Sequence, residues 1–206
     1  MLNPRKNEIT KVIEYNNSKD GGFIERNLYN PCLKFIEKEN YSTIKRETVY
    51  GPIKMFLLNW GRMGRVLERP DKRGWEDRLV KKIPELSDKL EMFRKMKLDN
   101  TDLAQYEDDI KTCYQQICNI VAPTSATKTL HLLCPEFFPL WDENIRNKAR
   151  EEDGRRGWTG LKGYYYFMEI TQGFLKKHNE ELSALSKKHD RPKLKITDEY
   201  FFCSTR

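Results

Sequence analysis

Lys128 and Asp142 are the residues whose types and positions best fit covalent chemistry in this chain. A lysine amine attacks carbon once it is neutral, and burial or a neighbouring positive charge favours that form. Lys128 lies between Ala126 and Leu130 in an apolar helical stretch, which favours partial burial. Asp142 stands where a helix is expected to begin, so backbone N–H groups fix its direction and keep it ionised. A carboxylate of this kind stabilises positive charge developing on a sugar.

Each of these two residues also has an ordinary structural explanation. Aspartate is common at helix N-caps, so Asp142 alone indicates no more than a helix start. Lys128 alone fits a surface lysine near the beginning of a helix. Their occurrence in this order, around a segment bounded by Pro135 and Pro139, favours the catalytic interpretation. His131, one turn after Lys128, fits a core histidine better than a catalytic one.

Other residues are candidates for contact with a nucleic acid. The hydroxyls of Thr124 and Ser125 lie in a predicted tight turn and can contact a phosphate. Trp141 fits core packing or stacking against an extruded base. The candidate binding residues are Thr124, Ser125, Trp141, Arg62, Arg65 and Arg146. Arg62 and Arg65 belong to a basic run, 62–73, that fits a phosphate-contacting strip and a solvated face equally well.

The charge of the chain is consistent with a polyanionic partner. The formal net charge is +7, and residues 51–100 hold 13 Lys or Arg against 8 Asp or Glu. A basic region of this kind favours nucleic acid, although it also keeps a protein soluble. Aromatic residues make up 12% of the chain, which supports a packed core and argues against disorder.

The five cysteines form no CxxC pair, so we expect reduced thiols, a reducing compartment and no iron–sulfur cluster. We expect no metal and no other cofactor. No segment has the length of a membrane span, and the first ten residues lack the apolar core of a signal peptide. We therefore expect a cytoplasmic, DNA-associated protein with no membrane contact, present as a monomer.

The apolar periodicity predicts helices throughout and only weak strand signals. Residues 1–22 are expected to be flexible or to form a short helix, and residues 23–206 a single helical domain. The expected helices cover 23–39, 49–60, 75–96, 101–121, a short stretch ending at Leu133, 143–152, 161–186 and 197–203. Pro84 should bend or split the third of these, and Asn100 or Thr101 should cap the fourth.

The stretch from Ile120 to Arg150 resembles the helix-hairpin-helix DNA glycosylase superfamily. In that family a hairpin joins two helices, the second carries a lysine in bifunctional members, and an aspartate follows. The segment FPLWDENIR around Asp142 is similar in character to the aspartate segment. The wider pattern most resembles small 8-oxoguanine DNA glycosylase-like proteins, and residues 56–65, FLLNWGRMGR, share a looser similarity. The turn here has no glycine, and the separation of 142 − 128 = 14 residues is shorter than the family's by roughly one helical turn.

This resemblance implies an all-α fold, an orthogonal bundle of about eight helices in two lobes with a cleft between them. It also implies excision of a damaged base, 8-oxoguanine by resemblance, from duplex DNA, with Asp142 stabilising the sugar cation and Lys128 as nucleophile. Two other interpretations stay open. One is a helical nucleic-acid-binding or partner-binding protein without catalysis, which the glycine-free turn favours. The other is an interaction protein whose aromatic clusters are simply core.

Overall fold

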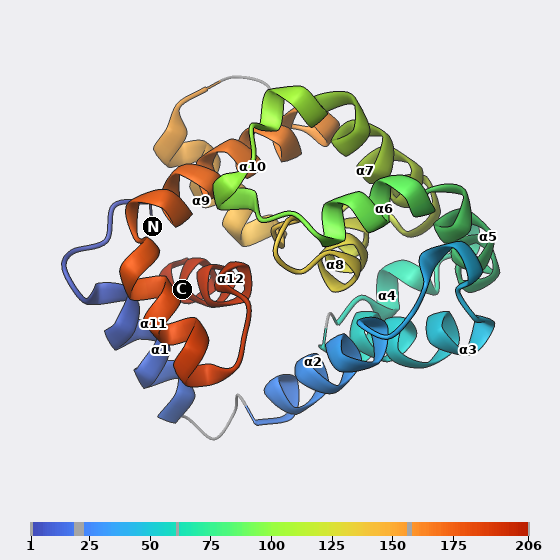
Figure 1. The fold of residues 1–206 in the computed structure, drawn as a ribbon, viewed down its shortest axis with the longest axis horizontal. Helices are drawn as coiled ribbons and strands as arrows, with labels where there is room; N and C mark the ends of the chain where they lie inside the picture. The colour runs from blue at the N-terminus through green and yellow to red at the C-terminus, as the bar shows by residue number, and fades with distance from the viewer. Residues whose placement is uncertain (1, 19–22, 61, 156–157, 206) are drawn as a thin grey trace.

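The computed structural model describes residues 2–18, 23–60, 62–155 and 158–205, with the backbone alone at 23–27 and 60. In this part of the chain the fold is all-α, with twelve α-helices, short 3₁₀ and π segments, and no strand (Figure 1). The α-helices are α1 (Glu8–Ser18), α2 (Phe23–Ile36), α3 (Arg46–Thr48), α4 (Gly64–Leu67), α5 (Trp75–Glu85), α6 (Ser87–Arg94), α7 (Glu107–Val121), α8 (Pro123–Leu133), α9 (Glu143–Asp153), α10 (Gly160–Lys177), α11 (Asn179–His189) and α12 (Lys193–Ser204). The all-α prediction is confirmed.

The expected count of about eight helices is too low. Two long predicted helices are each divided, the short helix that residues 1–22 were allowed forms as α1, and α3 and α4 lie outside the expected ranges. Residues 75–96 form α5 and α6, which separate at Leu86, two residues after Pro84. Residues 161–186 form α10 and α11, which separate at His178. The apolar stripe continues across both breaks, so periodicity alone did not show them.

Other predicted boundaries also differ from the observed ones. Helix α7 begins at Glu107, and two short 3₁₀ segments, η6 (Leu98–Asn100) and η7 (Leu103–Tyr106), precede it. Asp102 caps η7 by accepting a hydrogen bond from the Ala104 N–H, so a cap at residue 100 or 101 is not observed. The predicted helix 49–60 contains two π segments, η3 (Val49–Ile53) and η4 (Phe56–Trp60). Pro52 lies inside η3 and cannot donate a backbone hydrogen bond, which accounts for the irregular winding there.

The helices gather in two sets that the hairpin of α7 and α8 connects. One set comprises α1, α11 and α12, and the other comprises α2 and α5 with the segments η3 and η4. Helix α1 packs on α11 and α12, so the N-terminal helix lies beside the C-terminal ones (Figure 1). Helix α2 packs on η3, η4 and α8, while α5 packs on α7. The hairpin of α7 and α8 therefore contacts one set directly, and α10 links it to the other by packing on both α7 and α12.

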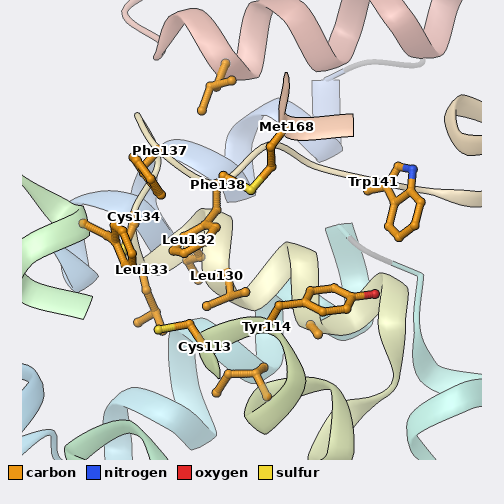
Figure 2. Close-up of a cluster of buried hydrophobic side chains, with 14 of the residues drawn as sticks. Cys113, Tyr114, Leu130, Leu132, Leu133, Cys134, Phe137, Phe138, Trp141 and Met168 are labelled. Carbon is orange, nitrogen blue, oxygen red and sulfur yellow. The ribbon is translucent and has the colours of Figure 1, made fainter. Parts of the chain in front are cut away.

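The core around the hairpin is rich in aromatic side chains (Figure 2). Phe93 stacks on Phe137, with ring centroids 4.4 Å apart, and meets Phe138 edge-on. Tyr114 stacks on Tyr164 at 4.6 Å. Large rings thus fill the space between α6, α7, α8 and α10, as the aromatic content of the sequence predicts.

All five cysteines are free thiols. None of the described helices combines the length and apolar character that crossing a membrane requires.

Gly163 is the point of closest backbone approach on α10. A Cβ atom there would lie 2.6 Å from the carbonyl carbon of Trp158. The Trp158 indole N–H donates to Asp153 at 3.0 Å, which holds the approaching segment in place. A side chain at this position must therefore displace backbone that is already tied down.

Replacing Gly163 with Ala is expected to lower the free energy of unfolding by about 1–3 kcal/mol, through overpacking against Trp158. The matched control is Gly173→Ala in the same helix, where a Cβ meets nothing within 4 Å. That change should instead stabilise the protein by up to about 1 kcal/mol, because alanine favours helix. Urea denaturation of both variants measures the difference, and equal effects would contradict the packing described.

Candidate functional site

A single residue, Ala122, connects α7 to α8. Its backbone has φ 76° and ψ 161°, a conformation that is normally restricted to glycine. Pro123 follows as the first residue of α8, where its fixed φ suits a helix start. The predicted tight turn over 122–126 is therefore wrong in extent, since residues 123–126 already belong to the helix.

The two candidate hydroxyls lie in the first turn of α8. Thr124 is half-buried, and its carbonyl accepts a hydrogen bond from the Thr127 hydroxyl at 3.0 Å. Ser125 is fully buried, and its hydroxyl has no hydrogen-bond partner among the described residues. The first intrahelical bond of α8 runs from the Ala126 N–H to the Ala122 carbonyl. The N–H groups of Thr124 and Ser125 precede it and are the groups that a phosphate at this helix end would meet.

Lys128 is the one half-buried residue in the otherwise buried run 125–133 of α8. Its Nζ lies 3.9 Å from the Met63 Sδ atom, on the segment that leads into α4. A thioether is a weak acceptor that carries no charge. The structure thus brings the lysine helix against the FLLNWGRMGR segment, the two stretches that carried the sequence resemblance.

Asp142 is the N-cap of α9, as predicted. Its Oδ1 atom accepts a hydrogen bond from the Ile145 N–H at 2.8 Å, and the side chain is half-buried. The carboxylate also acts on α12: burial raises the pKa of Asp198, Lys195 opposes that shift, and the negative charge of Asp142 adds to it. Asp142 therefore lies close enough to α12 for its charge to be felt there.

A hydrogen bond joins the segments that carry Lys128 and Asp142. The Trp141 backbone N–H donates to the Thr127 hydroxyl oxygen at 3.3 Å. The residue before Lys128 is thus bonded to the residue before Asp142, although 14 positions separate them in sequence. Convergence of the two side chains on one cleft stays a prediction.

Trp141 and Arg146 form a second contact at the start of α9. Trp141 is buried, with its indole stacked on Phe167 and tilted against Tyr164, so core packing accounts for it in this structure. The Arg146 guanidinium lies over the same indole, 5.6 Å from the ring centroid. Arg146 also forms an ion pair with Glu143 at 3.6 Å.

Arg62 and Arg65 are exposed on either side of Met63, the residue that meets Lys128. The same basic run contacts the hairpin, because the Lys72 ammonium donates to the Asn119 carbonyl at 3.4 Å near the end of α7. The candidate cations of residues 62–73 and the start of α8 are therefore neighbours in space.

His131 is a core residue, as the sequence favoured. Its Nδ1 atom lies 2.9 Å from the Phe138 carbonyl, which can only accept, so Nδ1 carries the proton. Its Nε2 atom then accepts from the Tyr29 hydroxyl at 2.8 Å. Burial lowers the pKa of His131 to about 3, which keeps the ring neutral. Both ring nitrogens are engaged, so this histidine is a structural link between α8 and α2.

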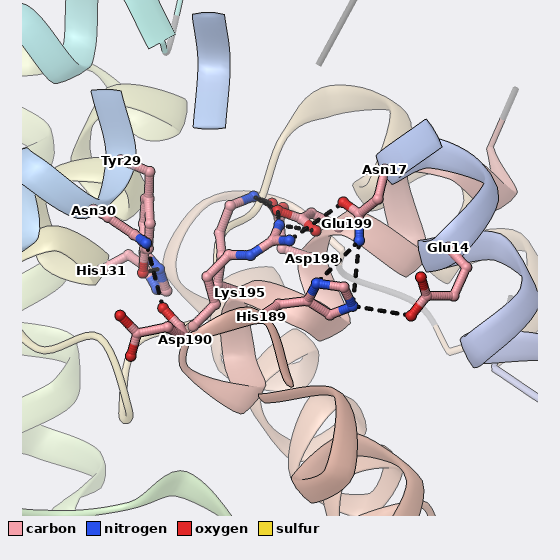
Figure 3. A network of polar contacts seen from close by, with 11 residues as sticks. Glu14, Asn17, Tyr29, Asn30, His131, His189, Asp190, Lys195, Asp198 and Glu199 are labelled. Atoms are coloured by element: carbon pink, nitrogen blue, oxygen red, sulfur yellow. Dashed lines mark hydrogen bonds and ion pairs between the residues drawn. The ribbon is translucent and has the colours of Figure 1, made fainter. Parts of the chain in front are cut away.

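A buried polar network extends from this histidine, and the sequence analysis missed it (Figure 3). The Lys195 ammonium lies over the Tyr29 ring at 5.7 Å and pairs with Asp198 at 2.7 Å. Arg191 pairs with Glu199 in the same cluster. The spacing of Lys195, Asp198 and Glu199 at three and four residues is the signal that identifies an ion cluster on one helix face.

Metal binding has no support in the described part of the chain, where no group of three or more His, Cys, Asp or Glu side chains is placed to hold an ion. Comparisons of this chain with protein-family models, with curated proteins and with solved structures find no match.

The conformation of Ala122 generates a stability prediction. Replacing Ala122 with Gly is expected to raise the free energy of unfolding by about 1 kcal/mol or more, because glycine adopts this φ and ψ without strain. The matched control is Ala184→Gly on the exposed face of α11, which should lose about 1 kcal/mol. Thermal and urea denaturation compare the two, and loss of stability in both would show that Ala122 is unstrained.

Proposed function

We propose that this protein is a DNA glycosylase that excises a damaged base from duplex DNA and acts through Lys128 and Asp142. The observation that carries the proposal is the hydrogen bond from the Trp141 N–H to Thr127, which holds the lysine helix against the start of the aspartate helix. An N-capping carboxylate and a half-buried amine on two bonded segments suit a reaction at a sugar carbon. The resemblance of residues 120–150 to the helix-hairpin-helix glycosylases supports the same reaction.

The chemistry assigns a distinct task to each residue. As the bond from C1′ to the base breaks, its electrons leave with the base and positive charge grows on the sugar, which the Asp142 carboxylate stabilises. The neutral Lys128 amine attacks C1′ and gives up a proton. The nitrogen lone pair then expels the ring oxygen O4′, which takes up a proton, so the sugar opens and leaves a Schiff base that permits later strand cleavage.

The DNA backbone would lie along the basic run and the hairpin. Arg62 and Arg65 flank the segment that meets Lys128, and Lys72 ties that run to the end of α7. Backbone N–H groups at the start of α8 add an anion site that needs no side chain. These contacts position the duplex without reading its sequence.

A binding protein without catalysis is the second candidate, and one observation favours it. Ala122 stands at a glycine-type backbone conformation and Ser125 is buried, so the hairpin presents a methyl group at its tip and withholds one of the two candidate hydroxyls. A protein that kept the fold and lost the reaction tolerates such changes. The two candidates differ in covalent trapping, which binding alone cannot produce.

Asp142→Asn should remain folded, since asparagine caps helices nearly as well as aspartate. It should nevertheless release a lesion base at least about a hundredfold more slowly, because the charge that stabilises the sugar cation is lost. Base release from a panel of lesion-containing duplexes measures the rate. Asp102→Asn, at the cap of η7, is the matched control and should keep the parent rate.

Lys128→Gln, tested alongside it, should bind DNA but yield no covalent adduct with borohydride, because no amine remains to form the Schiff base. Full activity in the Asp142→Asn variant, or trapping by the Lys128→Gln variant, would eliminate this mechanism. Binding by the parent protein without base release or trapping would support the second candidate.

Replacing Arg62 and Arg65 together with Ala should weaken binding to every duplex sequence alike. The slope of log affinity against log salt should become shallower by about 2, since two phosphate contacts are lost. The control replaces Lys176 and Lys187, exposed cations on α10 and α11, and should leave the slope unchanged. Fluorescence anisotropy over a salt series measures both, and identical slopes in the two double variants would place the DNA elsewhere.

A further inference from the structure

Two buried hydrogen-bond donors beside Asp142 have no partner among the described residues. They are the indole N–H of Trp141 and the hydroxyl of Tyr114, on side chains that are 2% and 1% exposed. Burial raises the pKa of Tyr114, so its hydroxyl stays protonated and able to donate. The Cys118 thiol is close enough to the hydroxyl to shift its pKa, but sulfur is a weak hydrogen-bond partner, and the hydroxyl has no partner at normal hydrogen-bond geometry. Unsatisfied buried groups are rare in folded proteins and call for an explanation.

The two donors belong to one aromatic assembly. Tyr114 and Trp141 both pack on Tyr164, with ring centroids 4.6 Å and 5.5 Å away. Figure 2 shows the Tyr114 hydroxyl and the Trp141 indole projecting on the same side of the cluster, away from Phe137 and Cys134. The aromatic surface and the unsatisfied donors therefore lie together, next to the residue proposed to stabilise the sugar cation.

Arg146 covers this assembly. Its guanidinium lies over the Trp141 ring at 5.6 Å, and its positive charge acts on the Tyr114 hydroxyl. Arg146 follows Asp142 by one turn of α9, and its backbone N–H donates to the Asp142 carbonyl at 2.9 Å, so both residues lie on one side of that helix. Its ion partner Glu143 is 76% exposed, which makes this a weak restraint on the arginine.

We propose that the space over Trp141 which Arg146 fills is a subsite for a nucleobase, and that Arg146 leaves the ring when the nucleobase enters. A guanidinium is planar and stacks on aromatic rings, so it fills the place of a flat heterocycle in the free protein. A nucleobase supplies what the arginine lacks, namely carbonyl oxygens and ring nitrogens at its edge that accept a hydrogen bond from the Tyr114 hydroxyl. The Trp141 N–H lies in the plane of its own ring and does not donate to a base stacked on that ring. Stacking on an aromatic side chain adds to this binding for any base.

The subsite deepens the proposed function and rests on it for the identity of the ring as an extruded base. An adjacent base would set its sugar near Asp142, the residue that follows Trp141 in the chain. The displaced arginine is long enough to meet a backbone phosphate, which stabilises the opened state by an ion pair. Trp141 would then have both functions that its sequence position suggests, core packing on one part of the ring and base stacking on another.

Calorimetric titration with 2′-deoxyguanosine and 2′-deoxyadenosine tests the subsite. These probes are uncharged, so removal of the arginine charge does not weaken them by Coulomb effects. Arg146→Ala should bind both nucleosides at least about threefold more tightly than the parent protein, because the ring no longer has to be uncovered. Adding Tyr114→Phe to that variant should weaken binding about three- to tenfold, the effect of one lost hydrogen bond. Adding Trp141→Phe should also weaken binding, because the smaller ring offers less stacking surface.

Thermal melting of each variant confirms that it is folded before titration. No gain in the Arg146→Ala variant would overturn the proposal. Affinity unchanged by both Tyr114→Phe and Trp141→Phe would also overturn it, and would show that the two donors bind a trapped water only.

Failure of the subsite and failure of the proposed function are distinguishable. Nucleoside binding that follows these expectations in a protein that releases no base would retain the subsite and reject glycosylase activity. Base release by the parent protein, with no gain of nucleoside affinity in the Arg146→Ala variant, would do the reverse. Slower base release by the Tyr114→Phe variant, with Lys128 and Asp142 intact and the expected nucleoside affinities, supports both.

Discussion

The satisfaction of polar groups inside α8 is the constraint on which the rest of the structure depends. Eight of the eleven residues of this helix are buried, and they include Ser125, Thr127, Thr129 and His131. Buried polar side chains are costly unless they are hydrogen-bonded. The hydroxyls of Thr127 and Thr129 donate to carbonyls three and four residues earlier, whereas His131 reaches outward to Tyr29 and Phe138. These outward bonds, with the one from Trp141, fix the positions of α2 and of the loop before α9.

The charge cluster on α12 extends this constraint to the C-terminal helices. Lys195 and Asp198 form a pair whose side chains are 5% and 13% exposed, and Arg191 and Glu199 form another beside it. Removing one member of such a pair leaves an uncompensated buried charge and costs about 3–5 kcal/mol. The pairs thus specify one arrangement of α12 against α2 and α9, and that arrangement places a fixed field beside Asp142.

Periodicity and composition were sufficient for the fold class and for the functions of several residues. They predicted an all-helical chain, a core histidine at 131 and an N-cap at Asp142, because each depends on local sequence. Pro84 correctly indicated the division of 75–96, which occurs at Leu86, whereas the break at His178 was missed because the apolar stripe continues while the backbone turns. Periodicity and composition also missed the cluster around Lys195, because burial of charges depends on which helices meet, and that is a property of the tertiary fold.

Ala122 departs from a helical hairpin in residue type, because glycine is usual there, but its backbone conformation is one typical of glycine. The absence of glycine from the turn placed the phosphate-binding role of the hairpin in doubt. A glycine in such a turn contributes its freedom to adopt a positive φ, and Ala122 adopts φ 76° and ψ 161° all the same. The direction of the N–H groups at the start of α8 depends on these backbone angles and not on the side chain. What the alanine adds is strain and one methyl group, so the turn keeps a glycine-type backbone path at a cost in stability.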